Sequence, residues 1–139
     1  MSGPKEEGRL SKRVLLIDDH LAFLEHVREL LSSEFTVVGV ATDGQDVLSA
    51  YDRDAPDVIV LDITMRHVSG IEASRTLLEY RPGTPIVILS VHREPEVVQS
   101  ALEAGAVAYV HKLSAGEDLI PAIHCALAGR RFVSETCTY

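Results

Sequence analysis

The sequence has no tryptophan, few aromatic residues and only two cysteines, and each scarcity excludes a class of protein. With aromatic residues at 5%, nothing indicates the stacking surface that single-stranded nucleic acids bind. Two cysteines cannot form the disulfide framework of a small secreted domain, so a reducing, cytoplasmic compartment is expected. No apolar run approaches the length of a membrane-spanning helix, and the polar residues 1–12 lack the apolar core of a signal peptide.

The sequence also lacks an excess of basic residues. Its formal net charge is −8, which argues against nucleic-acid binding by this chain alone, because phosphate contacts need a basic patch. The 139 residues are 46% hydrophobic and 24% charged. This length and composition are typical of one soluble globular domain with a proper core.

Apolar runs typical of buried strands alternate with helical patterns along the chain. The expected strands cover residues 14–18, 35–41, 58–61, 86–89 and 107–111, and helical patterns follow them over residues 23–31, 44–52, 71–78, 94–104 and up to about 128. Five such pairs with short links predict a doubly wound, flavodoxin-like α/β fold. This (βα)5 three-layer sandwich would have a parallel five-stranded sheet in the order 2-1-3-4-5.

The expected domain spans residues 13–129, after a disordered leader over residues 1–12. Residues 130–139 are expected to be a tail or the start of a linker, with Cys137 as an exposed thiol.

The start of the last helix is ambiguous. Ser114 and Glu117 have the spacing of a capping box. Pro121 conflicts with that start, because it would remove a hydrogen bond in the second turn. Either the helix kinks at Pro121, or its regular part begins near Asp118, which could also cap it; the sequence leaves both open.

Polar side chains stand where four of the expected strands end. Asp18 and Asp19 follow the first strand, Asp62 the third, Ser90 the fourth and Lys112 the fifth. The carboxyl ends of parallel strands meet at one edge of the sheet, where such folds bind ligands. Lys112 would lie two strands from Asp62, roughly 10 Å away, a gap that its long side chain could largely close. We therefore expect these side chains to form one site.

The chemistry of this set favours phosphoryl transfer. Three carboxylates so close repel one another, and without a cation at least one should have a raised pKa. Mg²⁺ is the obvious ion to relieve the repulsion, because it accepts a few carboxylates together with water and phosphate. Asp62 would then be the nucleophile that forms an acyl phosphate. Mg²⁺ and Lys112 would neutralise the phosphoryl oxygens, and the Ser90 hydroxyl could donate to one of them.

From Arg13 to Gly129 the chain resembles the receiver domain of two-component response regulators. The residues that carry the resemblance are Asp18, Asp19, Asp62, Met65, Ser69, Gly70, Ser90, Tyr109 and Lys112. The tripeptide Asp18-Asp19-His20 and the ending over residues 128–134 look most like the subfamily with a LuxR-type helix-turn-helix output domain. That output domain is absent from these 139 residues, so an excised receiver and a stand-alone one are both open.

The resemblance implies a role for each site residue. Asp62 would be the phosphoacceptor, Asp19 a direct Mg²⁺ ligand, and Asp18 an acid acting largely through a metal-bound water. The backbone carbonyl of Thr64 would complete the protein ligands of the metal. Ser90 and Tyr109 would form a switch pair, in which the aromatic ring turns inward as the hydroxyl follows the phosphate.

The implied function is a phosphorylation-dependent signalling switch that controls an output such as transcription. A histidine kinase or a phosphotransfer protein would supply the phosphoryl group. Phosphorylation would remodel the face of the fourth helix, fifth strand and fifth helix of the five expected pairs. That face, or the face of the first and fifth helices, would form a homodimer or bind an output. Self-phosphorylation and self-dephosphorylation are the only chemistry implied, so we expect no enzyme with an external substrate.

Some positions depart from the family pattern. Arg66 replaces a common proline, Val91 a common small residue, and Leu113 a frequent cis proline, so a trans peptide is expected there. Thr64 and His92 occupy positions that tune dephosphorylation in relatives. One alternative is therefore a receiver-fold interaction module that acts without phosphorylation. A weaker alternative is a haloacid dehalogenase-like phosphatase, which would need an acid where Thr64 stands.

Overall fold

The computed structural model describes residues 11–137, so most of the expected leader lies outside the described residues. The elements in chain order are β1 (Arg13–Ile17), α2 (Leu21–Leu31), β2 (Thr36–Ala41), the 3-10 turn η1 (Gly44–Asp46), α3 (Val47–Asp54), β3 (Val58–Leu61), α4 (Gly70–Tyr80), β4 (Ile86–Ser90), α5 (Pro95–Glu103), β5 (Ala108–His111), the 3-10 turn η2 (Lys112–Ser114), α6 (Ala115–Leu127) and β6 (Phe132–Val133). None of the described helices is long and apolar enough to cross a membrane.

The strands form one sheet in the order β2-β1-β3-β4-β5-β6, and every pair is parallel. The first five strands confirm the predicted order, and the short β6 extends the sheet beside β5. The chain winds from β1 to β2 in one direction and from β3 to β5 in the other. This reversal opens a crevice at the carboxyl ends of β1 and β3, where doubly wound sheets bind ligands.

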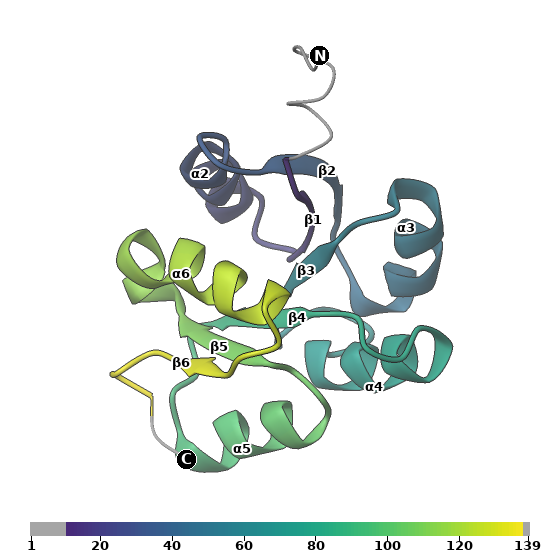
Figure 1. Cartoon of the computed structure of the whole chain (residues 1–139). Helices are drawn as coiled ribbons and strands as arrows, with labels where there is room; N and C mark the ends of the chain where they lie inside the picture. Colours follow the sequence, from purple (N-terminus) through teal and green to yellow (C-terminus); the bar gives the residue numbers. More distant parts are fainter. Residues whose placement is uncertain (1–10, 138–139) are drawn as a thin grey trace.

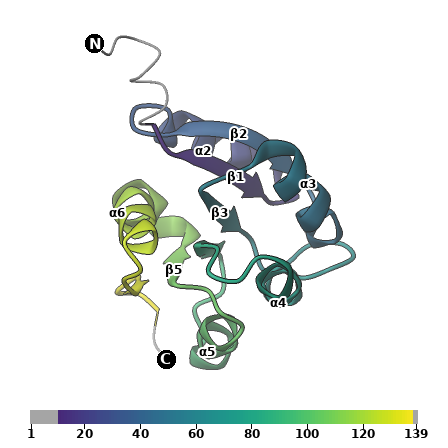
Figure 2. The same ribbon diagram turned by 45° about the vertical axis from the view of Figure 1, so that its right-hand side comes forward.

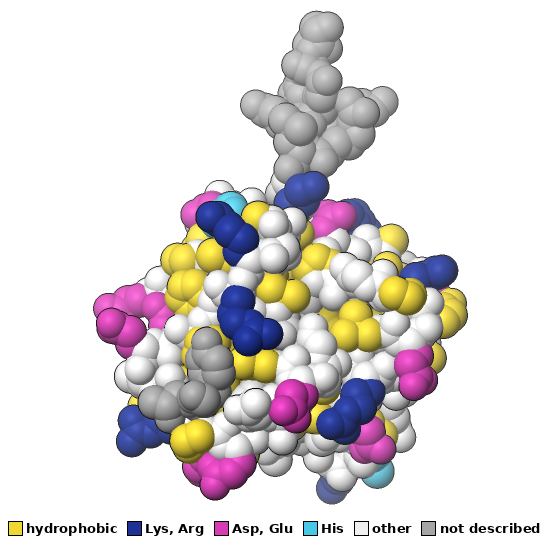
Figure 3. Space-filling view, turned by 60° about the horizontal axis from the view of Figure 1, so that its bottom comes forward, with side chains coloured by type: hydrophobic (Ala, Val, Ile, Leu, Met, Phe, Trp, Pro, Cys, Tyr) yellow, Lys and Arg dark blue, Asp and Glu magenta, His cyan; other side chains and the backbone are white. Residues whose placement is uncertain are grey.

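Both faces of the sheet are covered, which explains its almost wholly apolar strands. Helices α2 and α6 cover one face, and α3, α4 and α5 cover the other (Figure 1 and Figure 2). Side chains alternate along each strand, so Leu16 joins the core under α2 and α6 while Leu15 joins the core under the other three helices. Full burial of each such leucine contributes about 1.5–3 kcal/mol. Outside, on the side that bears α5, acidic, basic and hydrophobic side chains are intermixed (Figure 3).

Helix α6 settles the ambiguity at its start. It begins at Ala115 and continues through Pro121, so the alternative start near Asp118 is wrong. The capping-box prediction is also wrong, because Ser114 makes no side-chain cap hydrogen bond. The turn η2 runs directly into the helix and leaves Ser114 at φ −103° and ψ 7°, without the extended backbone of a capping residue. Pro121 and Glu117 are both exposed, so water can hydrate the carbonyl that lacks an N–H partner.

Residues 130–137, which we call the C-terminal segment, pack against the domain. Within this segment Phe132 and Val133 pair with β5. The expectation of an exposed Cys137 is wrong, since only 6% of this residue is exposed. The segment turns after β6, with the Cys137 N–H donating to the Ser134 carbonyl, and the Cys137 side chain enters the core that also contains Tyr109.

Candidate functional site

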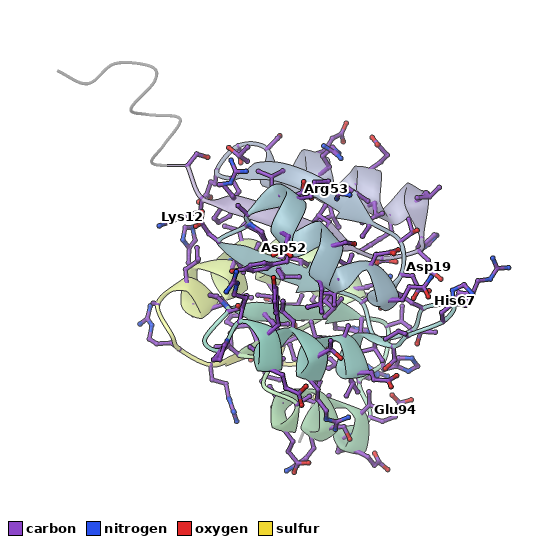
Figure 4. The ribbon with its side chains drawn as sticks, turned by 90° about the vertical axis from the view of Figure 1, so that its right-hand side faces the viewer. Lys12, Asp19, Asp52, Arg53, His67 and Glu94 are labelled. Atoms are coloured by element: carbon purple, nitrogen blue, oxygen red, sulfur yellow. The ribbon has the colours of Figure 1, made fainter. Side chains whose placement is uncertain are left out.

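The three predicted acids meet at the carboxyl edge of the sheet. Ile17 pairs with Leu61, so the residues that follow, Asp18 and Asp62, leave neighbouring strands side by side. One carboxylate oxygen from each of Asp18, Asp19 and Asp62 lies within 4.8 Å of the others. Asp18 and Asp62 are buried, whereas Asp19 is exposed. Figure 4 shows Asp19 at one edge of the molecule and Lys12, next to the start of β1, at the opposite edge.

Lys112 reaches the acids from the end of β5. Its Nζ lies 2.8 Å from Asp18 Oδ2 and 3.6 Å from Asp62 Oδ2, which confirms that its side chain can close the gap between the strands. The same Nζ is 4.6 Å from the centroid of the Phe23 ring on α2. Sequence reasoning placed Phe23 only in a helical stripe and missed this cation–π contact, which helps to hold the ammonium group in place.

The electrostatics of the cluster centre on Asp62. Burial raises the pKa of Asp62 to about 6, and the negative charge of Asp18 adds to the shift. The Lys112 ammonium and the Ile63 N–H, which donates to Asp62 Oδ1 at 2.8 Å, oppose it only in part. This agrees with the expected raised pKa of one acid in the cluster. Because the donors are all carboxylate oxygens and their charge is incompletely balanced, the cluster could hold a hard divalent cation.

Asp43, which sequence reasoning missed, holds the loop that follows Asp62. Its Oδ1 accepts from the N–H groups of Gln45 and Val68, each at 3.0 Å, and its Oδ2 accepts from the His67 N–H at 2.8 Å. Burial opposes ionisation, but these three donors outweigh it and lower the pKa of Asp43 to about 2. The dipeptide Asp43-Gly44 after β2 is a sequence signal for a tight turn, but it does not reveal which loop Asp43 contacts.

The same loop is fixed at its end by Gly70. The Gly70 N–H donates to the Ile63 carbonyl at 2.8 Å. A Cβ at this position would overlap the Asp62 carbonyl oxygen, so the close approach of α4 to the site requires glycine. The backbone that carries Thr64 is therefore held from both sides.

The switch-pair residues are connected through the backbone of His92. Ser90 is fully buried at the end of β4, and its Oγ accepts from the His92 N–H at 3.0 Å. Tyr109 is also fully buried, with its hydroxyl donating to the His92 carbonyl at 2.7 Å, so its ring is turned inward. Burial raises the pKa of Tyr109 to about 12. The Thr64 hydroxyl lies 2.9 Å from His92 Nε2, a link between two positions that the sequence had marked separately.

The positions that depart from the family pattern face solvent. Arg66 is exposed, Val91 is 60% exposed and Leu113 is 89% exposed. No cis peptide bond occurs in residues 11–137, which confirms the trans peptide expected at Leu113. Arg66 lines a groove beside the acids together with Asp19 and Leu21.

A flavodoxin-like α/β sheet with three clustered acids and a lysine at its topological switch point defines the class of this domain. The family model described as response regulator receiver domain matches residues 14–124, and the chain belongs to this family. The resemblance seen in the sequence is thus confirmed.

Relatives place the chain among NarL-like and LuxR-like regulators. It is 33% identical over 129 residues to the transcriptional regulatory protein DegU of Brevibacillus brevis, covering 91% of this chain and 55% of DegU. It is 38% identical over 127 residues to the nitrate/nitrite response regulator protein NarL of Escherichia coli K12, covering 90% of this chain and 59% of NarL. The chain therefore spans little more than half the length of these relatives.

Solved structures agree with this placement. A LuxR-family two-component response regulator from Aurantimonas sp. SI85-9A1 matches with a TM-score of 0.86 and 35% identity, over 90% of this chain and 91% of that one. The signal receiver domain of the putative response regulator NarL from Mycobacterium tuberculosis matches with a TM-score of 0.80 and 33% identity, over 86% and 98%.

Proposed function

We propose that this domain is a phosphorylation-dependent switch in which Asp62 accepts a phosphoryl group from a histidine kinase or a phosphotransfer protein. The observation that carries the proposal is the placement of Asp62, buried beside Asp18 and Asp19 and within 3.6 Å of the Lys112 ammonium. The regulated output is transcription, by analogy with DegU, which is named a transcriptional regulatory protein.

The two oxygens of Asp62 differ in their surroundings, and this difference supports a separate role for each. Oδ1 accepts the Ile63 N–H, whereas Oδ2 faces Lys112 and is the oxygen that attacks phosphorus. As the O–P bond forms, the P–N bond to the donor's phosphohistidine breaks and its electron pair stays on the imidazole nitrogen. Lys112 then pairs with a phosphoryl oxygen. Ser90 Oγ accepts from the His92 N–H, and its own O–H would turn to donate to another phosphoryl oxygen.

Mg²⁺ is the proposed metal. The carboxylates of Asp18, Asp19 and Asp62 and the backbone carbonyl of Thr64 would hold it, and when bound it supplies positive charge that neutralises the phosphoryl oxygens. The chain's own contribution is to fix these oxygens in advance. Asp18 is held by the His20 N–H at 2.9 Å, and the loop of Thr64 is held by Asp43 and Gly70.

The response is a change in interaction surface. Phosphorylation draws Ser90 toward the phosphoryl group and keeps the Tyr109 ring inward, which reshapes the face formed by α5, β5 and α6. That face, or the face of α2 and α6, forms a homodimer or contacts the output. The domain acts on its own aspartate only and has no turnover on an external substrate.

The test is intact mass after incubation with acetyl phosphate and Mg²⁺. One added phosphate that is lost under mild base is expected for the parent. The adduct should be absent from Asp62→Ala and present in Glu79→Ala, which removes an exposed acid of α4 far from the cluster. No adduct on the parent, together with no binding of beryllofluoride, would refute the proposal and favour an interaction module that works unphosphorylated.

A further inference from the structure

The C-terminal segment is joined to the strand that carries Tyr109. Val133 pairs with Tyr109 in parallel register, and the Ser134 N–H donates to the Tyr109 carbonyl at 2.9 Å. Figure 1 and Figure 2 both show the segment running from the end of α6 along β5 toward α5. The backbone of the C-terminal segment is therefore hydrogen-bonded to a residue of the switch pair.

Ser134 anchors this segment through its side chain. It is only 1% exposed, and its Oγ donates to Asp118 Oδ2 of α6 at 2.7 Å. The same Oγ accepts from the His111 N–H at 3.1 Å, one residue before Lys112. These two bonds tie the segment to α6 and to the end of β5 next to the site. Buried bonds of this kind hold a short segment in one place, because leaving either partner unpaired is costly.

The segment also occupies the space beside the Tyr109 ring. Residues in register on parallel strands place their side chains on the same face, so Val133 lies next to Tyr109. Cys137 is buried in the same core, together with Val98 and Ala101 of α5. With the ring inward, Val133 and Cys137 close the edge of this core. A ring turned outward past the edge of β5 would need the volume that they fill.

We propose that the C-terminal segment docks only when Tyr109 is turned inward, so that its docking follows the state of the phosphorylation site. The inference rests on the proposed function, in which phosphorylation stabilises the inward ring. Docking and phosphorylation then stabilise each other. Such coupling is reciprocal, so releasing the segment weakens the phosphorylated state by the factor by which phosphorylation strengthens docking.

The Cys137 thiol provides a direct measurement of docking. In a Cys125→Ser background Cys137 is the one remaining cysteine, and because it is buried we expect it to react with a thiol reagent only when the segment leaves its place. Labelling is followed with Mg²⁺ alone and with Mg²⁺ plus beryllofluoride, and beryllofluoride occupancy is read by ¹⁹F NMR in the same samples. Occupancy should slow labelling by roughly 5–150-fold, the usual range of such couplings. In Asp62→Ala, beryllofluoride should leave the rate unchanged.

A second experiment changes residues of the C-terminal segment itself. Ser134→Ala removes both anchoring bonds and should speed the labelling of Cys137 and weaken beryllofluoride binding, each at least fivefold. Glu135→Ala, an exposed change in the same segment, should do neither. Circular dichroism checks that the variants fold.

The outcomes separate this inference from the proposed function. Full beryllofluoride occupancy with an unchanged labelling rate would overturn the coupling and leave the phospho-switch intact. Faster labelling in Ser134→Ala with unaltered beryllofluoride affinity would overturn it too. Failure of beryllofluoride to bind the parent would remove the proposed function, and the coupling with it.

Discussion

Replacing the central carboxylate by its neutral isostere should stabilise the protein in the absence of metal. Asp62→Asn removes a negative charge that is buried against Asp18 while keeping an oxygen to accept the Ile63 N–H. Lys112 keeps its nearer partner, since its Nζ is 2.8 Å from Asp18 and 3.6 Å from Asp62. The variant therefore loses an unfavourable interaction and leaves no buried cation unpaired.

The expected size follows from the raised pKa of Asp62. Going from 3.8 to about 6 is a shift of about two units, and each unit is worth 1.36 kcal/mol, so the upper limit is about 3 kcal/mol. Partial contact with water reduces this to about 1–2 kcal/mol. In a domain of this length that is a rise in Tm of about 3–7 °C.

The raised pKa of Asp62 also determines in which direction the stability gain of Asp62→Asn changes with pH. The folded protein binds the Asp62 proton more tightly than the unfolded chain, so the penalty is absent below pH 3.8 and grows as the pH rises. Above about pH 6 it is fully present. The Tm advantage of Asp62→Asn should thus be seen at pH 7.5 in EDTA and shrink at pH 4.5.

Thermal unfolding by circular dichroism at the two pH values is the assay, with Glu79→Gln as the matched exposed control. Added Mg²⁺ should raise the Tm of the parent more than that of Asp62→Asn, because binding to the folded state stabilises it. A variant that melts below the parent at pH 7.5, or an advantage equal at both pH values, would refute the electrostatic account.

Three further substitutions test the parts around Asp62. Lys112→Ala frees Asp18 Oδ2 and removes a cation, so titration should show tighter Mg²⁺ binding. Phosphorylation by acetyl phosphate should slow by on the order of 10²-fold. Weaker Mg²⁺ binding would contradict this expectation. Gly70→Ala places a methyl group on the Asp62 carbonyl and should lower the free energy of unfolding, measured in urea, by about 1–3 kcal/mol. An unchanged value would mean that the loop can move to accommodate the methyl group without cost. His92→Ala removes the hydrogen bond to Thr64, which is worth about 1 kcal/mol. The half-life of the phosphorylated protein, followed by mass spectrometry, should become about fivefold shorter. A longer half-life would show that this bond does not restrict the access of water to the phosphoryl group.

The sheet order and the main site could be predicted because both follow from local patterns and one topological rule. Runs such as Val58–Leu61 are apolar at every position, as expected of a short strand that is covered on both faces. Once the sheet is parallel, the residue after each strand must lie at one edge, and this places Asp62 beside Asp18 and within reach of Lys112. No side-chain packing detail was needed for that step.

Helix starts were less predictable, because a capping motif depends on the backbone that precedes it. Ser114 and Glu117 have suitable spacing, but η2 keeps the chain coiled ahead of α6. Ser114 therefore lacks the extended backbone of a capping residue, and its hydroxyl makes no cap hydrogen bond. The spacing alone carries no information about that turn.

What the sequence did not reveal is a set of polar contacts between residues far apart along the chain. Asp43 accepts hydrogen bonds from His67 and Val68, which follow it by 24 and 25 positions. His92 contacts Thr64, which is 28 positions away, and Ser134 donates to Asp118, which is 16 positions away. Hydrophobic periodicity cannot register such pairs, because each is formed by one polar group whose partner is set by how two loops meet in the folded chain. One of these contacts holds the loop after Asp62, one joins that loop to His92 after β4, and one fixes the C-terminal segment. Local pattern thus places the reacting groups, and long-range polar contacts decide how firmly they are held and to what they are connected.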